Sequence, residues 1–236
     1  KYLSQCNEKL ALQDMLTKLP NRFSFCQTHE KYIASSKPFY LLYVNINEFR
    51  RHNKFYGHNE GDKLLIELSK RIKSIIKESD FIARVCGDEF AVILTNMNNQ
   101  SACNIIVKHI FNKTSKPFHT NNLESFNVSI SVGAANFPDD AQSVEELMKF
   151  ADLSVYNDKK NKTNKTNSLQ FYSSSMMDAS HHLIEVEREL RQAIKNEEFE
   201  LFLQPIIDLK SKNINKAEAL IRWNHPQKGI INPDQF

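Results

Sequence analysis

The chain has 236 residues, 41% of them hydrophobic and 25% charged, which is the composition of a globular protein with one large or two small domains. Its net charge of +3 is too small to favour nucleic acid or a membrane surface as a partner. No apolar run approaches the ~20 residues that a membrane-spanning helix needs.

The four cysteines show no CxxC spacing, so we expect neither a disulfide framework nor a zinc site, and we expect a reducing, cytoplasmic setting. Because the chain does not begin with Met and stops abruptly at Phe236, we expect a fragment, and membrane attachment through upstream parts stays open.

Apolar periodicity predicts helices and strands in alternation along the first 160 residues. Expected helices cover 1–13, 61–76, 101–112 and 139–160, with a polar helix or loop over 48–58. Expected strands cover 39–46, the two arms of a hairpin within 81–95, and 126–135. Residues 159–175 are basic and polar, which favours a loop and a domain boundary. Beyond it we expect a helix over 182–196 and strands over 199–207 and 214–223.

Two apolar, β-branched runs between Phe81 and Thr95 flank a four-residue polar break, Cys86 to Glu89. This pattern predicts a β-hairpin that carries the adjacent carboxylates of Asp88 and Glu89 on a tight turn. Strong strands on both sides favour a rigid site for a cation or a phosphate. The alternative is an ordinary polar loop, because Gly-Asp is common turn chemistry.

The hairpin and its surroundings resemble the signature of GGDEF domains, the diguanylate cyclases that condense two GTP molecules into cyclic di-GMP. The resemblance covers roughly residues 10–168, and so many spaced matches argue against coincidence. The matching elements, in the family's order, are Asp14…Leu-Thr…Leu-Pro-Asn-Arg22, Asn45-Ile-Asn47-Glu-Phe-Arg50, Asn53, Gly57-His58, Gly61-Asp62, Arg84-Val-Cys86-Gly87-Asp88-Glu89-Phe90, Ser131-Val-Gly133, and Ala151-Asp152 through Tyr156 and Lys159. The resemblance implies an α+β, palm-like nucleotidyl-cyclase fold with a central, mainly antiparallel five-stranded sheet flanked by helices.

The tail resembles the start of an EAL domain, the cyclic di-GMP phosphodiesterase. The matches are Phe202-Leu-Gln204-Pro205, Glu218-Ala219-Leu220-Ile-Arg222-Trp223, His225-Pro226 and Gly229. In that family Glu218 corresponds to a metal ligand, and Gln204 and Arg222 to substrate contacts. Because only about the first quarter of a (β/α) barrel is matched, we expect no phosphodiesterase activity from this fragment. Its apolar strand faces are expected to pack on the first domain or on another copy of the chain.

These two resemblances predict the domain organisation. We expect an N-terminal linker helix over 1–13, a GGDEF domain over 14–168, a linker over 169–180, and the N-terminal fragment of an EAL domain over 181–236.

The family reaction joins a 3′-hydroxyl to the α-phosphorus of a second GTP and needs two divalent cations, Mg²⁺ or Mn²⁺. The resemblance assigns metal ligation to Asn45 and Asp88, and catalysis to Asp88 and Glu89. Asn45 and Asn47 both stand where the family has Asp, and an amide oxygen carries no charge. At an effective dielectric of ~20, unit charges ~4 Å apart interact by about 4 kcal/mol, roughly double for a dication. We therefore expect the cation to bind weakly if at all.

GTP binding is implied for a second group of residues. Asn53 and Asp62 match the pair that reads the guanine edge, and helix capping is the alternative role for each. Arg50 replaces the family Lys and keeps its charge, Gly87 belongs to the signature turn, and Lys159 matches a phosphate contact. Thr163 stands where the family has Arg and Lys162 where it has Gly, which leaves phosphate binding by this segment in doubt.

Two further departures bear on activity and feedback. Cys86 replaces the first glycine of the signature, and a positive φ at residue 86 would cost on the order of 1 kcal/mol. Lys77 and Asp80 stand where the family has the Arg-x-x-Asp site of product inhibition, so feedback inhibition is not expected.

Together these residues favour a degenerate GGDEF domain that binds GTP or cyclic di-GMP weakly or not at all and regulates the rest of the EAL domain in the intact protein. The alternative is an active cyclase working as a homodimer, in which each monomer presents one GTP to the other. A third class is an interaction scaffold that binds no nucleotide.

Overall fold

The computed structural model describes residues 11–97, 99–119, 125–161 and 166–236. The helix expected over 1–13 therefore lies almost entirely outside the described residues. The chain divides into two compact units, Lys1–Met176 and Met177–Phe236, each with a core of its own. Within the described ranges, no helix combines the length and the apolar character needed to cross a membrane.

Strand β1 (Phe39–Ile46) forms the centre of the first unit, because its apolar residues are buried on both faces. It pairs antiparallel with β3 on one side and with β6 on the other. The sheet has the order β2-β3-β1-β6-β7, and β6–β7 is its one parallel pair. This confirms the mainly antiparallel five-stranded sheet. Its other strands are β2 (Phe81–Cys86), β3 (Glu89–Thr95), β6 (Ile130–Phe137) and β7 (Ser168–Phe171).

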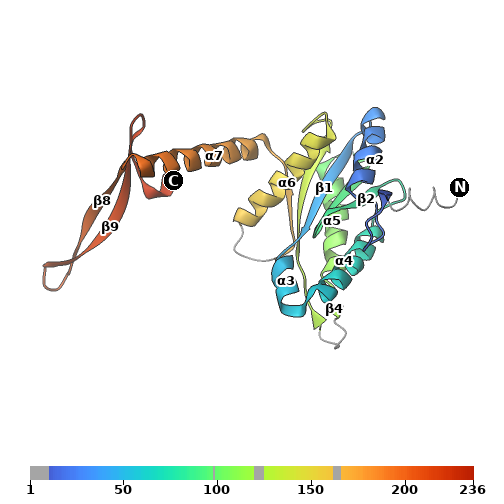
Figure 1. The fold of residues 1–236 in the computed structure, drawn as a ribbon, viewed down its shortest axis with the longest axis horizontal. Coiled ribbons are helices and arrows are strands. Elements are labelled where there is room, and N and C mark those ends of the chain that lie inside the picture. The colour runs from blue at the N-terminus through green and yellow to red at the C-terminus, as the bar shows by residue number, and fades with distance from the viewer. Residues whose placement is uncertain (1–10, 98, 120–124, 162–165) are drawn as a thin grey trace. The chain divides into compact units, whose positions relative to one another are not determined.

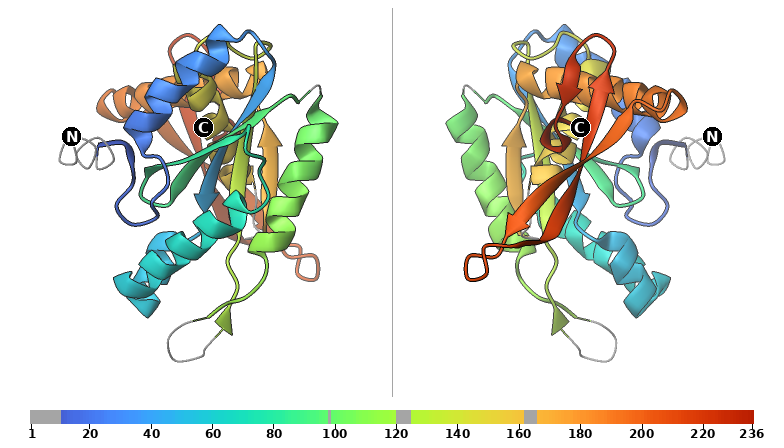
Figure 2. Two further views of the ribbon diagram at one scale, coloured as in Figure 1. Left: turned by 90° about the vertical axis from the view of Figure 1, so that its right-hand side faces the viewer. Right: turned by 90° about the vertical axis from the view of Figure 1, so that its left-hand side faces the viewer.

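Helices cover both faces of this sheet (Figures 1 and 2). Leu42 and Val44 of β1 belong to one core, and Leu41 and Tyr43 to the other, as the period-2 alternation of a strand requires. The first core is closed by α4 (His58–Lys73) and α5 (Gln100–Thr114), the second by α2 (Arg22–Ala34) and α6 (Val144–Asn161). The flanking helices that the resemblance implies are therefore confirmed.

Three smaller elements complete the first unit. Helix α3 (Phe49–Tyr56) follows β1 directly and contacts α4. Strands β4 (Phe118–His119) and β5 (Ser125–Phe126) pair with each other and extend away from the sheet (Figure 2).

Several boundaries differ from the sequence predictions. Helix α4 begins at His58 rather than at Gly61, because Gly57 (φ +89°) ends α3 and redirects the chain at once. Helix α6 begins at Val144 instead of residue 139. The single strand predicted over 126–135 is divided into β5 and β6, since residues 127–129 leave the ladder, and β6 continues to Phe137.

The loop predicted over 159–175 is wrong in part. It includes the end of α6, strand β7 and the first residues of α7 (Ser174–Lys195). Leu169 and Phe171 of β7 pack against the core on the α4/α5 face, so the first unit continues beyond residue 168. The four residues of β7 are too short a signal to stand out in a polar segment.

The second unit contains most of α7 and a three-stranded antiparallel sheet in the order β10-β9-β8. Its small core gathers Ala193, Trp223 and Ile231. These described residues form no closed barrel, and most of β8 is exposed. That another surface covers these strands stays a prediction. The elements are β8 (Phe199–Ile207), β9 (Ile214–His225), β10 (Gly229–Ile231) and the short 3₁₀ helix η1 (Pro233–Gln235).

Arg84 on β2 joins the segment before α2 to the hairpin tip. Its Nη1 donates to both carboxylate oxygens of Asp14 at 3.1 and 3.2 Å, and its Nε and Nη2 donate to the carbonyl of Gly87 at 2.9 and 2.7 Å. Thr17 also donates to Asp14, through its backbone amide and its hydroxyl. Partial burial acts to raise the pKa of Asp14, but the hydrogen bonds from Thr17 and Arg84 outweigh it and hold that pKa below its ordinary value. Asp14 therefore bridges the segment before α2 and strand β2.

Gly133 on β6 lies where α6 crosses the sheet, and a Cβ there would come within 1.9 Å of the Ala151 carbonyl oxygen. We predict that Gly133→Ala lowers the free energy of unfolding by about 3 kcal/mol, the upper part of the usual cost of overpacking, because the clash is with backbone. Urea denaturation measures this change in the free energy of unfolding. Gly87→Ala is the control, since its Cβ would meet open space and only its φ of +46° is strained, which costs about 1–2 kcal/mol. Equal losses in the two variants would contradict the close approach of α6.

We predict that Arg84→Met destabilises the chain by about 1.5–3 kcal/mol at pH 7, the usual contribution of hydrogen bonds to a charged group. Because the pKa of Asp14 is lowered from 3.8 in the folded state, its share of the stability is present above about pH 4 and is lost as the pH falls through the folded pKa. Denaturation at several pH values should show that the difference in unfolding free energy between wild type and Arg84→Met becomes smaller in acid. Arg51→Met removes an exposed pair with Glu48 and should cost less than about 1 kcal/mol. A pH-independent difference for Arg84→Met would be evidence against the Asp14 contact.

Candidate functional site

The tip of the β2–β3 hairpin lies beside the end of β1. Glu89 is opposite Asn45 in the ladder, and the backbone amide of Ile46 donates to the carbonyl of Asp88 at 3.4 Å. The turn has two residues, Gly87 and Asp88, rather than the four expected, because residues 86 and 89 pair with each other. The positive φ falls on Gly87 (+46°) and not on Cys86. The strain considered for Cys86 therefore does not arise.

Lys159, in the last turn of α6, reaches this point from the other side. Its Nζ donates a hydrogen bond to Oδ1 of Asn45 at 2.5 Å. Its charge also acts on Asp88 and Asp152. The structure thus brings together four predicted site residues, Asn45, Asp88, Glu89 and Lys159.

The pKa values of Asp88 and Asp152 are raised above the ordinary value of an aspartate. Burial raises the pKa of Asp88 and the charge of Glu89 adds to this, while the Asp88 backbone amide and the charges of Lys159 and Arg84 oppose it. Loss of solvent likewise raises the pKa of Asp152, and Glu89 again adds to the effect. For both aspartates, burial therefore outweighs the stabilisation that the Lys159 ammonium gives to the charged carboxylate.

Glu89 is held in place from within the sheet. The hydroxyl of Tyr43 donates to Oε2 of Glu89 at 2.7 Å. Burial raises the pKa of Tyr43, and the hydrogen bond and charge of Glu89 raise it further, so the phenol stays protonated as a donor. Glu89 is therefore a fixed acceptor and not a freely moving hairpin side chain.

Asn53 and Asp62 lie at the corner between α3 and α4. A Cβ on Gly61 would come within 1.8 Å of Oδ1 of Asn53, so the Asn53 side chain occupies space that only glycine leaves open. That Oδ1 is buried without a hydrogen-bond partner among the described residues, which costs about 1–3 kcal/mol unless a ligand supplies a donor. Neither residue occupies a capping position, so the capping alternative is wrong for both. Arg50 is exposed on the same helix as Asn53.

The donors at the hairpin tip do not fit a pair of divalent cations. Asp88 offers a half-buried carboxylate, but Oδ1 of Asn45 already accepts from an ammonium, and Glu89 accepts from Tyr43. Across the described ranges, no three His, Cys, Asp or Glu side chains gather into a group that could hold a metal. Asn47 adds no charge, and its amide is engaged with Ser129 and Ser131.

Other predicted residues serve structural roles or lie elsewhere. The carboxylate of Asp80 accepts from the backbone amides of Lys77 and Thr95, each at 2.9 Å, so it closes the turn before β2. Lys162 and Thr163 lie outside the described residues.

The three residues matched to the EAL site share one face of the β8–β9 hairpin. Gln204 is directly opposite Glu218, and Arg222 lies four residues farther along β9, which keeps it on the same face. The guanidinium of Arg222 lies 5.7 Å from the ring centroid of Phe202 on that face. The register therefore groups the residues that the resemblance singled out.

Two functional neighbours were not predicted as site residues, although the sequence carried a signal for each. Tyr43 precedes Asn45 by two positions on a strand and so faces the same side. Asp152 precedes Lys159 by seven positions on a helix, which is about two turns. Face periodicity applied to the residues already singled out would have found both.

The sequence matches two family models and several known proteins. Residues 11–165 match the model described as diguanylate cyclase, GGDEF domain, and residues 187–236 match the EAL domain. The chain is 34% identical over 232 residues to MucR, a bifunctional diguanylate cyclase/cyclic di-GMP phosphodiesterase of Pseudomonas aeruginosa. It is 32% identical over 232 residues to NbdA, a cyclic di-GMP phosphodiesterase of the same organism. These alignments cover 97% of this chain but 33% and 29% of the two relatives, so the chain spans about a third of their length.

Solved structures agree on the fold. The GGDEF domain of TpbB (YfiN) from P. aeruginosa has a TM-score of 0.68 at 25% identity, covering 72% of this chain and 99% of that one. The coiled coil and GGDEF domain of DgcB from Caulobacter crescentus, solved in complex with c-di-GMP, has a TM-score of 0.64 at 23% identity, covering 72% and 90%. GGDEF domains generally use Mg²⁺ or Mn²⁺. With a family model spanning most of the first unit and the same fold in both solved domains, the chain belongs to the GGDEF family of diguanylate cyclase domains, followed by a short EAL match.

Proposed function

We propose that this chain is part of a cyclic di-GMP signalling protein whose GGDEF domain is degenerate, with weak or no cyclase activity, and regulates the attached EAL phosphodiesterase. The pairing of the two matches along one chain supports this role, as do relatives whose names combine cyclase and phosphodiesterase. Cys26, Cys86 and Cys103 are unpaired, which agrees with a reducing, cytoplasmic setting.

One observation carries the proposal. The ammonium of Lys159 bonds to the amide oxygen of Asn45, at the position where the family places a carboxylate that binds a metal. A cation arriving here meets the Asp88 carboxylate, a neutral amide in place of the second carboxylate, and the fixed positive charge of Lys159. Mg²⁺ or Mn²⁺ therefore binds weakly, and the triphosphate is not activated.

Nucleotide recognition is better supported than turnover. Asn53 keeps a buried, unpaired acceptor beside Gly61, and Asp62 is exposed next to it. Arg50, Gly87 and Lys159 supply charge and backbone for phosphates. We infer that GTP is bound without efficient condensation, so the domain acts as a nucleotide-responsive regulator.

The second candidate is an active cyclase that works as a homodimer. Asp88 and Glu89 are retained at the hairpin tip, and Tyr43 holds Glu89 in a fixed orientation. Incubation with GTP and Mg²⁺ or Mn²⁺, followed by chromatography, distinguishes the two. Robust cyclic di-GMP formation would overturn the degenerate reading, and the absence of heat on titration with GTP would favour a scaffold that binds no nucleotide.

We predict that Asn45→Asp raises the affinity for Mn²⁺ in the presence of GTP at least tenfold, and that cyclic di-GMP formation appears or increases with it. The reason is the restored charge, since a full carboxylate–dication attraction at ~4 Å is about 8 kcal/mol at an effective dielectric of ~20 before hydration returns most of it. Electron paramagnetic resonance of free Mn²⁺ measures the affinity independently of turnover.

Asn99→Asp is the matched control. It adds the same charge at the start of α5, where the side chain caps the helix by accepting from the Ala102 amide at 2.9 Å, and Asp preserves that cap. Mn²⁺ affinity should not change there. If Asn45→Asp behaves like Asn99→Asp, the missing carboxylate is not the defect.

A further inference from the structure

A cavity of about 760 Å³ opens beside α3. Its apolar lining residues Ile46, Leu64 and Val128 belong to the core on the α4/α5 face of the sheet, whereas Lys159 comes from α6 on the other face. The volume is within the ~300–1,000 Å³ typical of small-molecule sites. The cavity is therefore on the opposite face of the sheet from Lys159.

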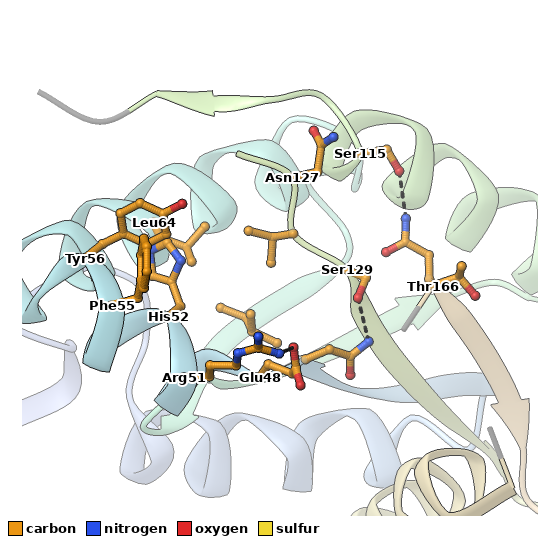
Figure 3. Close-up of a pocket in the computed structure, with 14 residues that line it drawn as sticks. Glu48, Arg51, His52, Phe55, Tyr56, Leu64, Ser115, Asn127, Ser129 and Thr166 are labelled. Atoms are coloured by element: carbon orange, nitrogen blue, oxygen red, sulfur yellow. Dashed lines mark hydrogen bonds and ion pairs between the residues drawn. The ribbon is translucent and has the colours of Figure 1, made fainter. Parts of the chain in front are cut away.

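One wall of the cavity is aromatic. His52, Phe55 and Tyr56 of α3 cluster there, with ring centroids 4.8 Å apart for His52–Tyr56 and 4.7 Å apart for Phe55–Tyr56 (Figure 3). The side chain of Phe55 is 79% exposed. An aromatic ring left open beside two others is a stacking surface for a planar ligand.

The opposite wall offers neutral hydrogen-bonding groups from loops far apart in sequence (Figure 3). The hydroxyl of Ser129 accepts from the amide of Asn47 at 2.9 Å, and that of Ser115 accepts from the amide of Asn167 at 2.7 Å. Because each hydroxyl accepts from an amide, its own proton is left to donate. The two serines are thus oriented donors for a ligand that carries acceptors.

His52 lines the cavity and carries a buried polar atom. Its Nε2 has no hydrogen-bond partner in the part of the chain that the structure describes. A buried ring nitrogen without a partner is costly. Burial also lowers the pKa of His52, so the ring is neutral near pH 7.

The charge of the lining restricts what could bind. Glu48 and Arg51 are its charged residues and pair with each other at 3.3 Å. A triphosphate or a cyclic dinucleotide would bring two or more negative charges to a surface with no unpaired cation of its own among these lining residues. The lining therefore suits an uncharged ligand.

We propose that this cavity binds a nucleoside-like molecule, an uncharged planar heterocycle that stacks on the exposed ring of Phe55 and accepts hydrogen bonds from Ser115 and Ser129. The aromatic wall sets the planar shape, the two hydroxyls require ring nitrogens or carbonyls as acceptors, and the paired charges exclude phosphates. This inference does not depend on cyclase activity.

Saturation-transfer NMR and calorimetry on the intact chain test it, with adenosine and uridine as probes. At least one should bind with a dissociation constant of about 1 mM or lower. Phe55→Ala should weaken binding by about 5- to 150-fold, the equivalent of the ~1–3 kcal/mol of a stacked base. Because Phe55 is exposed, this variant keeps the core intact. Ile105→Ala on α5, which also truncates an exposed apolar side chain (55%), should bind like wild type.

Three results would overturn the proposal. One is no binding of either nucleoside at about 1 mM, and another is equal affinity in wild type and Phe55→Ala. The third is loss of adenosine binding in Asp62→Ala, which would assign the nucleoside to the guanine-reading side of α3. None of these outcomes bears on whether GTP is turned over, so a failure here is distinguishable from a failure of the proposed function.

Discussion

The proposed loss of metal binding depends on one contact, the hydrogen bond from Lys159 to Asn45. It joins the end of the central strand to the last turn of α6, and its oxygen faces the hairpin that carries Asp88. With a carboxylate at residue 45 the same lysine would be one cation among several anions. With an amide there, one of the anions that would attract a metal is missing while the ammonium remains, so under the proposed function the site attracts a divalent cation less strongly.

The position of the Lys159 ammonium depends on the position of α6, which carries it. The absence of a side chain at Gly133 lets the helix come so close to β6 that the Ala151 carbonyl oxygen lies 1.9 Å from where a Cβ would be. From Ala151 to Lys159 the helix rises by about 12 Å, so a small tilt at the crossing point would move the ammonium by an appreciable part of a hydrogen-bond length. Close packing in the core therefore sets the geometry of the Lys159–Asn45 hydrogen bond at the end of the central strand.

Sequence reasoning succeeded where the signal was local and strong. The apolar run of β1 and the two arms of the hairpin are correct because each is a long, β-rich segment. It failed at β7, whose four residues gain their stability from parallel pairing with β6, a long-range effect that no local pattern reports. It also misplaced the start of α4, because Gly61 was taken as a boundary signal while its actual role is to make room for Asn53.

The same limit applies to the site. Motif spacing grouped Asn45, Asp88, Glu89 and Lys159, but it did not say that Lys159 would engage the amide or that Tyr43 would fix Glu89. Those facts depend on which side chains share a face once the sheet is assembled. Helix α3 makes the point most clearly, since one side carries Asn53 over Gly61 and the other carries the aromatic wall of the cavity. The family motif includes residues on one side of this helix only. The cavity on its other side becomes visible only in the packed structure.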